Sequence, residues 1–134
     1  MDLGGQFQRI LEGLPVIQSA RCCVVAYSGG IDSHVLLHLC HQAGVTVRAV
    51  HIHHGLQHEA DHWDAHCRDV CSHLGIAYQC VRVEARAARG ESPEDAARQA
   101  RYRALEQNLG ADEVLLTAHH LQDQAETLLL QLMR

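Results

Sequence analysis

Lysine is absent from this chain of 134 residues, and arginine supplies all 11 of its basic side chains. That absence excludes enzymes that need a phosphate-binding lysine in a Walker A loop or a lysine that forms a Schiff base. Long apolar runs are also missing, and the first residues have neither the basic nor the apolar region of a secretory signal. We therefore expect a cytoplasmic protein with no membrane span.

The composition favours one compact domain. Hydrophobic residues make up 47% of the chain, and a chain of this length can bury enough surface to form a core without a metal or a disulfide. The six cysteines are therefore expected to be reduced thiols, as is usual in the cytosol. The net charge of −5 argues against an independent nucleic-acid-binding domain, because such domains are usually basic.

Short apolar runs alternate with longer amphipathic segments. The pattern predicts strands over residues 22–27, 45–52, 76–83 and 113–118 and helices over 3–18, 33–43, 59–74, 93–109 and 121–134. Four strand–helix units indicate an α/β fold with a doubly wound parallel sheet, which binds ligands at the carboxyl ends of its strands. We expect an N-terminal helix within residues 1–20 and one domain over 21–134. The last predicted helix has no stop signal, so we expect the natural protein to continue beyond it.

The segment after the first predicted strand has the features of an anion-binding loop. Gly29 and Gly30 stand where the strand passes into a helix, and glycines let backbone N–H groups approach phosphate oxygens closely. Ser28 and Ser33 add hydroxyl donors, and Asp32 is suited to hold Mg²⁺ beside a polyphosphate. An ordinary glycine turn with serine caps is the alternative, but the order of strand, Ser-Gly-Gly-x-Asp-Ser and helix favours phosphate binding.

This loop resembles the PP-loop of the ATP pyrophosphatases, which cleave ATP between the α- and β-phosphates and transfer AMP to an oxygen. Three further segments are similar to those of tRNA(Ile)-lysidine synthases: residues 51–56 (His-Ile-His-His-Gly-Leu), 91–102 (Glu-Ser-Pro-Glu-Asp-Ala-Ala-Arg-Gln-Ala-Arg-Tyr) and 117–127 (Thr-Ala-His-His-Leu-Gln-Asp-Gln-Ala-Glu-Thr). The resemblance covers residues 21–134, and four motifs in order are far more specific than any one of them.

The resemblance implies an adenine nucleotide alpha hydrolase-like fold and an ATP-dependent ligase. Such an enzyme uses ATP and Mg²⁺ to adenylate the C2 oxygen of the wobble cytidine of an isoleucine tRNA. L-lysine then displaces AMP and forms lysidine. The tRNA would be bound mainly by regions outside this chain.

The same resemblance implies roles for particular residues. It assigns nucleotide binding to Ala26, Ser28, Gly29, Gly30, Ile31, Asp32, Ser33, His51 and Arg98. It assigns catalysis to Asp32, Asp123, His120 and Arg101. It assigns Mg²⁺ to Asp32 and Asp123.

Simpler interpretations remain open for several of these residues. Asp123 and Glu126 also suit a helix start, where a carboxylate complements the helix dipole. Arg98 and Arg101 are predicted on one helical face that suits phosphate, either of ATP or of the tRNA backbone, but a solvated face with a Glu94–Arg98 pair explains much of the same pattern. His120 could contact nucleotide or substrate, or only cap its loop.

Two further hypotheses concern metal binding and function. His58, His62 and His66 recur every four residues and could share a helical face, although solvated histidines are the simpler interpretation. The chain has no Cys-x-x-Cys pair, which counts against tRNA thiolation. The alternative functions are another PP-loop ligase or amidotransferase that adenylates a small molecule, and an ATP-binding module without turnover.

Overall fold

The computed structural model describes residues 3–54, 58–84, 89–118 and 130–133. Its elements in chain order are α1 (Leu3–Glu12), α2 (Pro15–Gln18), β1 (Cys22–Ala26), α3 (Ile31–Gln42), β2 (Val47–His53), α4 (His58–Leu74), β3 (Ala77–Arg82), α5 (Pro93–Gln107), β4 (Glu113–Ala118) and β5 (Leu130–Met133). None of the helices in these ranges is long and apolar enough to cross a membrane.

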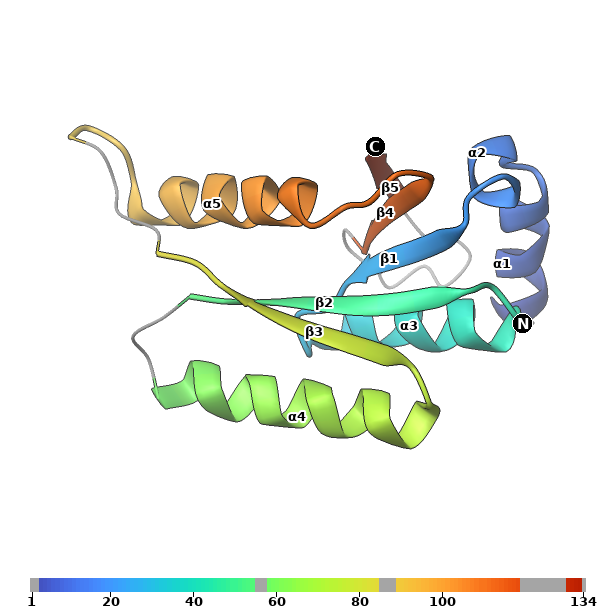
Figure 1. Cartoon of the computed structure of the whole chain (residues 1–134), viewed down its shortest axis with the longest axis horizontal. Coiled ribbons are helices and arrows are strands. Elements are labelled where there is room, and N and C mark those ends of the chain that lie inside the picture. The colour runs from blue at the N-terminus through green and yellow to red at the C-terminus, as the bar shows by residue number, and fades with distance from the viewer. Residues whose placement is uncertain (1–2, 55–57, 85–88, 119–129, 134) are drawn as a thin grey trace.

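The strands form one sheet in the order β3-β2-β1-β4-β5. The first four are parallel, and β5 runs antiparallel to β4. Helices α3 and α4 cover one face of the sheet, and α5 covers the other (Figure 1). This arrangement confirms the predicted α/β fold with a parallel, doubly wound sheet. The bounds of β1 to β4 and of α3 to α5 lie within two residues of those predicted.

Strand β1 lies at the centre of the sheet and is buried on both faces. Cys23 and Val25 belong to a core shared with α1, α3 and α4, whereas Val24 packs into a second core with Leu105 of α5. The continuous apolar run over residues 22–27 was the sequence signal for this position, because only a strand covered on both faces needs no polar side. Because β1 is the central strand, the loop that follows it emerges at the centre of the sheet.

Several cysteines act as small apolar side chains in these cores. Cys40 and Cys67 have no solvent exposure. Burial raises the pKa of each thiol to about 12, so both stay protonated at neutral pH. A buried, protonated thiol is a poor nucleophile and a poor metal ligand, so these residues serve packing.

The N-terminal region forms two helices instead of the one predicted over residues 3–18. Helix α1 ends at Glu12, and α2 begins at Pro15. Leu14 is extended, with φ −112° and ψ 99°. Proline has no N–H to donate and forces the preceding residue out of the helical region, which explains the break.

The prediction of a helix over residues 121–134 is wrong where the structure describes that segment. Residues 130–133 form β5, whose backbone pairs with β4 in the register Leu115 with Met133 and Ala118 with Leu130. Residues 121–129 lie outside the described ranges. The apolar run at 128–133 suits a helix or a strand equally well, and the unpaired edge of β4 offers hydrogen bonds that only a strand can accept and donate.

Glu113 links β2 and β4 at the amino-terminal ends of the parallel strands. Its carboxylate accepts hydrogen bonds from Nε and Nη2 of Arg48 at 2.9 and 2.8 Å and from the Gly110 N–H at 2.6 Å. Arg48 lies on β2 and Glu113 on β4, so the pair spans the central strand β1. The Arg48 hydrogen bonds lower the pKa of Glu113 to about 2.

We predict that Glu113→Gln makes the stability of the protein less dependent on pH. A pKa lowered from 4.5 to about 2 means that ionised Glu113 stabilises the folded state fully above pH 4.5 and loses this effect as the pH falls toward 2. The shift corresponds to roughly 3 kcal/mol at neutral pH. Urea unfolding should therefore show a less stable variant at pH 7 and a difference that vanishes near pH 2.

Glu106→Gln is the matched control, because Glu106 is an exposed acid on the outer side of α5. Its free energy of unfolding should follow that of the unmodified protein at every pH. A constant difference between Glu113→Gln and the unmodified protein from pH 7 to pH 2 would contradict the role of the ionised carboxylate.

Candidate functional site

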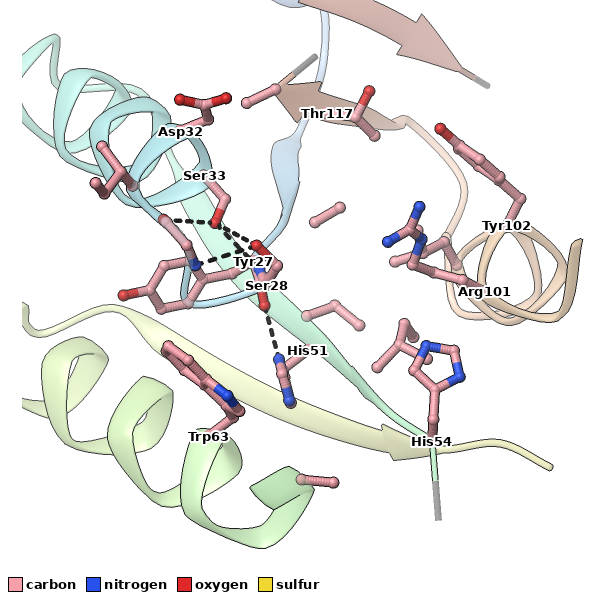
Figure 2. A pocket seen from close by; sticks show the side chains of 18 of the residues that line it. Tyr27, Ser28, Asp32, Ser33, His51, His54, Trp63, Arg101, Tyr102 and Thr117 are labelled. Atoms are coloured by element: carbon pink, nitrogen blue, oxygen red, sulfur yellow. Dashed lines mark hydrogen bonds between the residues drawn. The ribbon is translucent and has the colours of Figure 1, made fainter. Parts of the chain in front are cut away.

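A cavity of about 670 Å³ opens at the carboxyl ends of the central strands. Ala26 of β1 lies between Val50 of β2 and Thr117 of β4, and these side chains form its floor on the α5 face of the sheet. Arg101 and Tyr102 of α5 form one wall (Figure 2). The small side chain of Ala26 leaves space above the centre of the sheet. The cavity thus lies where the doubly wound fold was predicted to bind ligands.

The loop after β1 forms the opposite end of the cavity and is held by its two serines. Ser33 Oγ accepts a hydrogen bond from the Ser28 N–H at 3.1 Å, and the two hydroxyl oxygens lie 3.0 Å apart. Ser28 Oγ in turn accepts from the Gly30 N–H at 3.2 Å. Both hydroxyl groups were predicted to contact phosphate, and here they also set the shape of the loop.

Helix α3 begins directly at this loop and points its amino terminus at the cavity. Gly30 is the N-cap residue and has no side-chain acceptor, and Ile31 and Asp32 follow it in the first turn. The first N–H groups of a helix have no acceptor within the helix, and the helix dipole places partial positive charge there. Ile31 is 81% exposed, and with Asp32 it lines the cavity. The arrangement suits a bound anion, with one carboxylate beside it.

Gly29 fits a position that no other residue could occupy without strain. Its φ of +88° lies in the left-handed region that favours glycine. A Cβ added at this position would lie 2.8 Å from Cε3 of Trp63 and 3.1 Å from Sγ of Cys67. The loop therefore rests against α4, and Gly29 supports the cavity from behind while Gly30 lines it.

His51 ties the end of β1 to β2. Its Nδ1 lies 2.9 Å from the carbonyl oxygen of Tyr27, an acceptor, so Nδ1 carries the proton and donates it (Figure 2). The ring is buried and lines the cavity. His51 was predicted to contact the nucleotide, and its hydrogen bond also holds the backbone from which the loop starts.

The far end of the cavity carries positive charge. His54, the residue after β2, and Arg101 of α5 line it (Figure 2). Burial lowers the pKa of His54, and the nearby Arg101 guanidinium lowers it further. His54 is therefore neutral at pH 7, and Arg101 supplies the charge at this end.

Arg98 lies outside this cavity. It lines a separate hollow on the outer side of α5 with Asp95, Arg103 and Glu106. Tyr102 borders both spaces, and the guanidinium carbons of Arg98 and Arg101 lie 5.8 and 5.6 Å from the centre of its ring. The assignment of Arg98 to ATP stays a prediction, and its position is better suited to a partner that approaches from outside.

The remaining predicted site residues fall outside the described ranges. These are His120 and Asp123, together with Glu126. Among the side chains that are described, no group of three or more histidine, cysteine, aspartate or glutamate residues is arranged to hold a metal ion. The hypothesis of a metal site on His58, His62 and His66 stays a prediction, because the side chain of His58 is outside the described part of the structure. His66 packs edge-to-face against Trp63, with ring centres 5.8 Å apart.

The site residues predicted from the sequence leave out several residues that line the cavity, among them Trp63 and Thr117. Trp63 is the only tryptophan of the chain and stands four residues before buried Cys67, a spacing that puts both on the side of α4 facing the sheet. Thr117 is a polar residue that follows three apolar residues near the carboxyl end of β4. Both signals were present in the sequence and could have been used.

Comparison with known sequences identifies close relatives of the chain. The sequence profile of the PP-loop domain matches residues 3–134. A tRNA(Ile)-lysidine synthase from Methylococcus capsulatus is 53% identical over 114 residues, which cover 82% of this chain and 26% of the relative. The enzyme of the same name from Pseudomonas aeruginosa is 53% identical over 131 residues, covering 94% and 29%. The chain thus spans less than a third of these relatives' length.

Solved structures share the fold at low sequence identity. An NH3-dependent NAD synthetase from Campylobacter jejuni superimposes with a TM-score of 0.59 at 16% identity, covering 85% of this chain and 52% of that one. The U34-tRNA thiolase NcsA from Methanococcus maripaludis gives a TM-score of 0.50 at 23% identity, covering 60% and 28%. These likenesses concern the fold alone.

We predict that Gly29→Ala displaces Trp63, whereas Gly44→Ala does not. Gly44 has a φ of +75° and no atom within 4 Å of an added Cβ, so it matches the backbone strain of Gly29 without the contact. Each substitution should lower the free energy of unfolding by roughly 1 kcal/mol through strain, and Gly29→Ala by more.

Tryptophan fluorescence and urea unfolding test this prediction, since Trp63 is the only reporter. The emission spectrum of the folded protein should change in Gly29→Ala and stay as in the unmodified protein in Gly44→Ala. Identical spectra and equal stability losses in the two variants would show that the loop does not press on α4.

Proposed function

The chain belongs to the PP-loop domain family, and on that premise we propose that it binds Mg·ATP as the nucleotide-binding domain of a tRNA(Ile)-lysidine synthase. One observation carries the proposal: the loop over residues 28–33 places the amino terminus of α3, two glycines and one carboxylate at the end of a cavity that could hold a nucleotide. Membership of this family implies ATP binding. The tRNA and L-lysine come into the proposal through the relatives' name and the sequence motifs.

The cavity suggests how ATP would lie in it. The phosphates would lie against the loop at residues 28–33, where backbone N–H groups and the α3 dipole favour negative charge. The adenosine would extend over the apolar floor of Ala26 and Val50 toward His54 and Arg101. This direction follows from the cavity, because the loop closes one end and α5 borders the other.

Asp32 fits the role of a Mg²⁺ ligand in this arrangement. Asp32 lines the cavity, as Ser28 and Ser33 do, and carboxylate and hydroxyl oxygens are ligands that Mg²⁺ accepts. When bound, the metal would neutralise charge on the phosphates and on the leaving pyrophosphate. The assignment of Asp123 as a second ligand remains a proposal from the motif.

The proposed reaction needs positioning and charge stabilisation more than covalent catalysis. The C2 oxygen of cytidine forms a bond to the α-phosphorus while the bond from that phosphorus to the pyrophosphate oxygen breaks, and pyrophosphate leaves with the electron pair. Loop N–H groups and the α3 dipole would stabilise the growing negative charge. The neutral amine of lysine then attacks C2, and AMP leaves.

Arg98 and Arg103 support contact with the tRNA from outside the cavity. Both lie on the outer side of α5, and a guanidinium binds phosphate oxygens through its planar set of donors. Asp95 and Glu106 in the same hollow reduce its net charge. A domain with a net charge of −5 would thus add few contacts of its own, so the regions outside this chain would bind most of the tRNA.

We predict that Asp32→Asn weakens ATP binding when Mg²⁺ is present and does not weaken it when Mg²⁺ is absent. With Mg²⁺, loss of the carboxylate ligand should raise the dissociation constant for ATP by about tenfold. Without Mg²⁺, the variant should bind ATP as tightly as the unmodified protein or more tightly, since a negative charge beside the phosphates is gone. Calorimetric titration with ATP and GTP, followed in parallel by Trp63 fluorescence, measures both cases.

Asp95→Asn is the matched control, because Asp95 also stands in the first turn of a helix but lies outside the cavity. It should bind ATP like the unmodified protein under both conditions. Equal weakening by Asp32→Asn with and without Mg²⁺ would remove the metal-ligand role, and equal binding of ATP and GTP would argue against an adenine-specific site.

We further predict that Arg101 and Arg98, the two arginines beside Tyr102, differ in their contribution to ATP binding. Arg101→Gln removes the charge at the far end of the cavity and should raise the dissociation constant for ATP several-fold. Arg98→Gln changes a side chain of the same kind outside the cavity and should leave that constant within about twofold. Equal losses in the two variants, measured by calorimetry, would assign Arg98 to ATP as the sequence motif implied.

A further inference from the structure

Thr117 carries a buried hydroxyl group that no described residue pairs with. The side chain is 7% exposed and lines the cavity, and its Oγ1 has no hydrogen-bond partner in the described part of the chain. A buried hydroxyl that makes no hydrogen bond destabilises the folded protein, and valine would fill the same space without that penalty. A polar residue kept at this position therefore points to a partner that is present only when the cavity is occupied.

The register of the sheet places this hydroxyl on the floor of the cavity, beside Ala26. Val25 pairs with Leu116, so Thr117 lies level with Ala26, and Val50 lies level with Ala26 on the other side. Figure 2 shows Thr117 between Ser33 of α3 and Tyr102 of α5. A ligand atom that reaches Oγ1 therefore lies on the β4 side of the cavity floor, level with Ala26.

The distance from the phosphate loop indicates which part of a nucleotide reaches Thr117. Ala26 precedes Ser28 by two residues, and strands rise by about 3.3 Å per residue, so Thr117 lies about 7 Å back from the loop along the strand direction. In a nucleotide whose phosphates occupy the loop, the ribose lies at about this separation and the base lies farther away. The ribose hydroxyl groups are thus the nearest polar atoms.

We propose that the Thr117 hydroxyl hydrogen-bonds a ribose hydroxyl of the bound nucleotide and so helps to fix the sugar above the sheet. This inference rests on the proposed binding of ATP. A hydroxyl group both donates and accepts, so Oγ1 pairs with a sugar hydroxyl in either sense. Rotation about χ1 moves Oγ1 among three staggered positions while the backbone of β4 stays in place.

Thr117→Val tests the proposal because we expect it to stabilise the ligand-free protein and to weaken ATP binding. The melting temperature of the ligand-free protein should rise, since the unpaired hydroxyl is gone, while the dissociation constant for ATP should increase by about five- to tenfold. Thr117→Ser keeps the hydroxyl and should bind ATP within about twofold of the unmodified protein. A lower melting temperature for Thr117→Val would show that the hydroxyl is structural and would overturn the proposal.

Gln6→Met is the matched control for the stability effect. Oε1 of Gln6, on α1, is also buried without a partner among the described residues, and Gln6 does not line the cavity. This variant should also raise the melting temperature, but its dissociation constant for ATP should stay unchanged. If it weakened ATP binding as much as Thr117→Val does, the effect of Thr117 would not be local to the cavity and the proposal would fail.

Titration with 2′-deoxy-ATP and 3′-deoxy-ATP identifies the atom of the ligand. One of the two should bind the unmodified protein about five- to tenfold more weakly than ATP, and Thr117→Val should cause no further loss with that analogue. Equal additional losses with both analogues would place the hydroxyl on another part of ATP and overturn the proposal. If the unmodified protein binds ATP and Thr117→Val binds it equally well, only this inference fails; if the unmodified protein binds no ATP, the proposed function fails with it.

Discussion

The contact between Gly29 and α4 is the constraint on which the site depends. The loop turns at a left-handed backbone position, and the space that a side chain would need is filled by Trp63 and Cys67. Because α4 follows β2 and the loop follows β1, this contact joins two neighbouring strand–helix units near the carboxyl ends of their strands. The hydrogen bond from His51 to the Tyr27 carbonyl joins the same two units one step earlier. The loop thus keeps its shape without a ligand.

The two ends of the parallel strands differ in how their buried polar groups are paired. At the amino-terminal end, Glu113 has its hydrogen bonds satisfied by Arg48 and Gly110, and ionisation of this buried carboxylate stabilises the fold. At the carboxyl-terminal end, the small side chain of Ala26 leaves a cavity, and the Thr117 hydroxyl has no hydrogen-bond partner among the described residues. Glu113 thus stabilises the fold through partners within the protein, whereas the Thr117 hydroxyl lies where a ligand could reach it.

Local patterns were sufficient to predict most of the fold and the centre of the site. Apolar runs located β1 to β4, and the start of α5 lies at Pro93 as predicted, with Oγ of the N-cap residue Ser92 accepting a hydrogen bond from the Asp95 N–H. The Ser-Gly-Gly-x-Asp-Ser segment located the loop at residues 28–33, because the hydrogen bonds among Ser28, Gly30 and Ser33 are local, whereas the contact of Gly29 with α4 could not be predicted from this segment. The strand at residues 130–133 was missed because pairing with β4 is a long-range choice that the apolar run itself does not determine.

Whether a side chain of α5 lines the cavity or lies just outside it depends on its angle around the helix axis. Helical spacing in the sequence does not resolve that angle finely enough. Arg98 and Arg101 stand three residues apart, so they differ by about 60° around the helix axis, and sequence reasoning placed them on one face. Tyr102 lies at the boundary, and that offset is enough to put Arg101 inside the cavity and Arg98 outside it. The same helix can therefore present one guanidinium to a small ligand in the cavity and another to a larger partner on the surface.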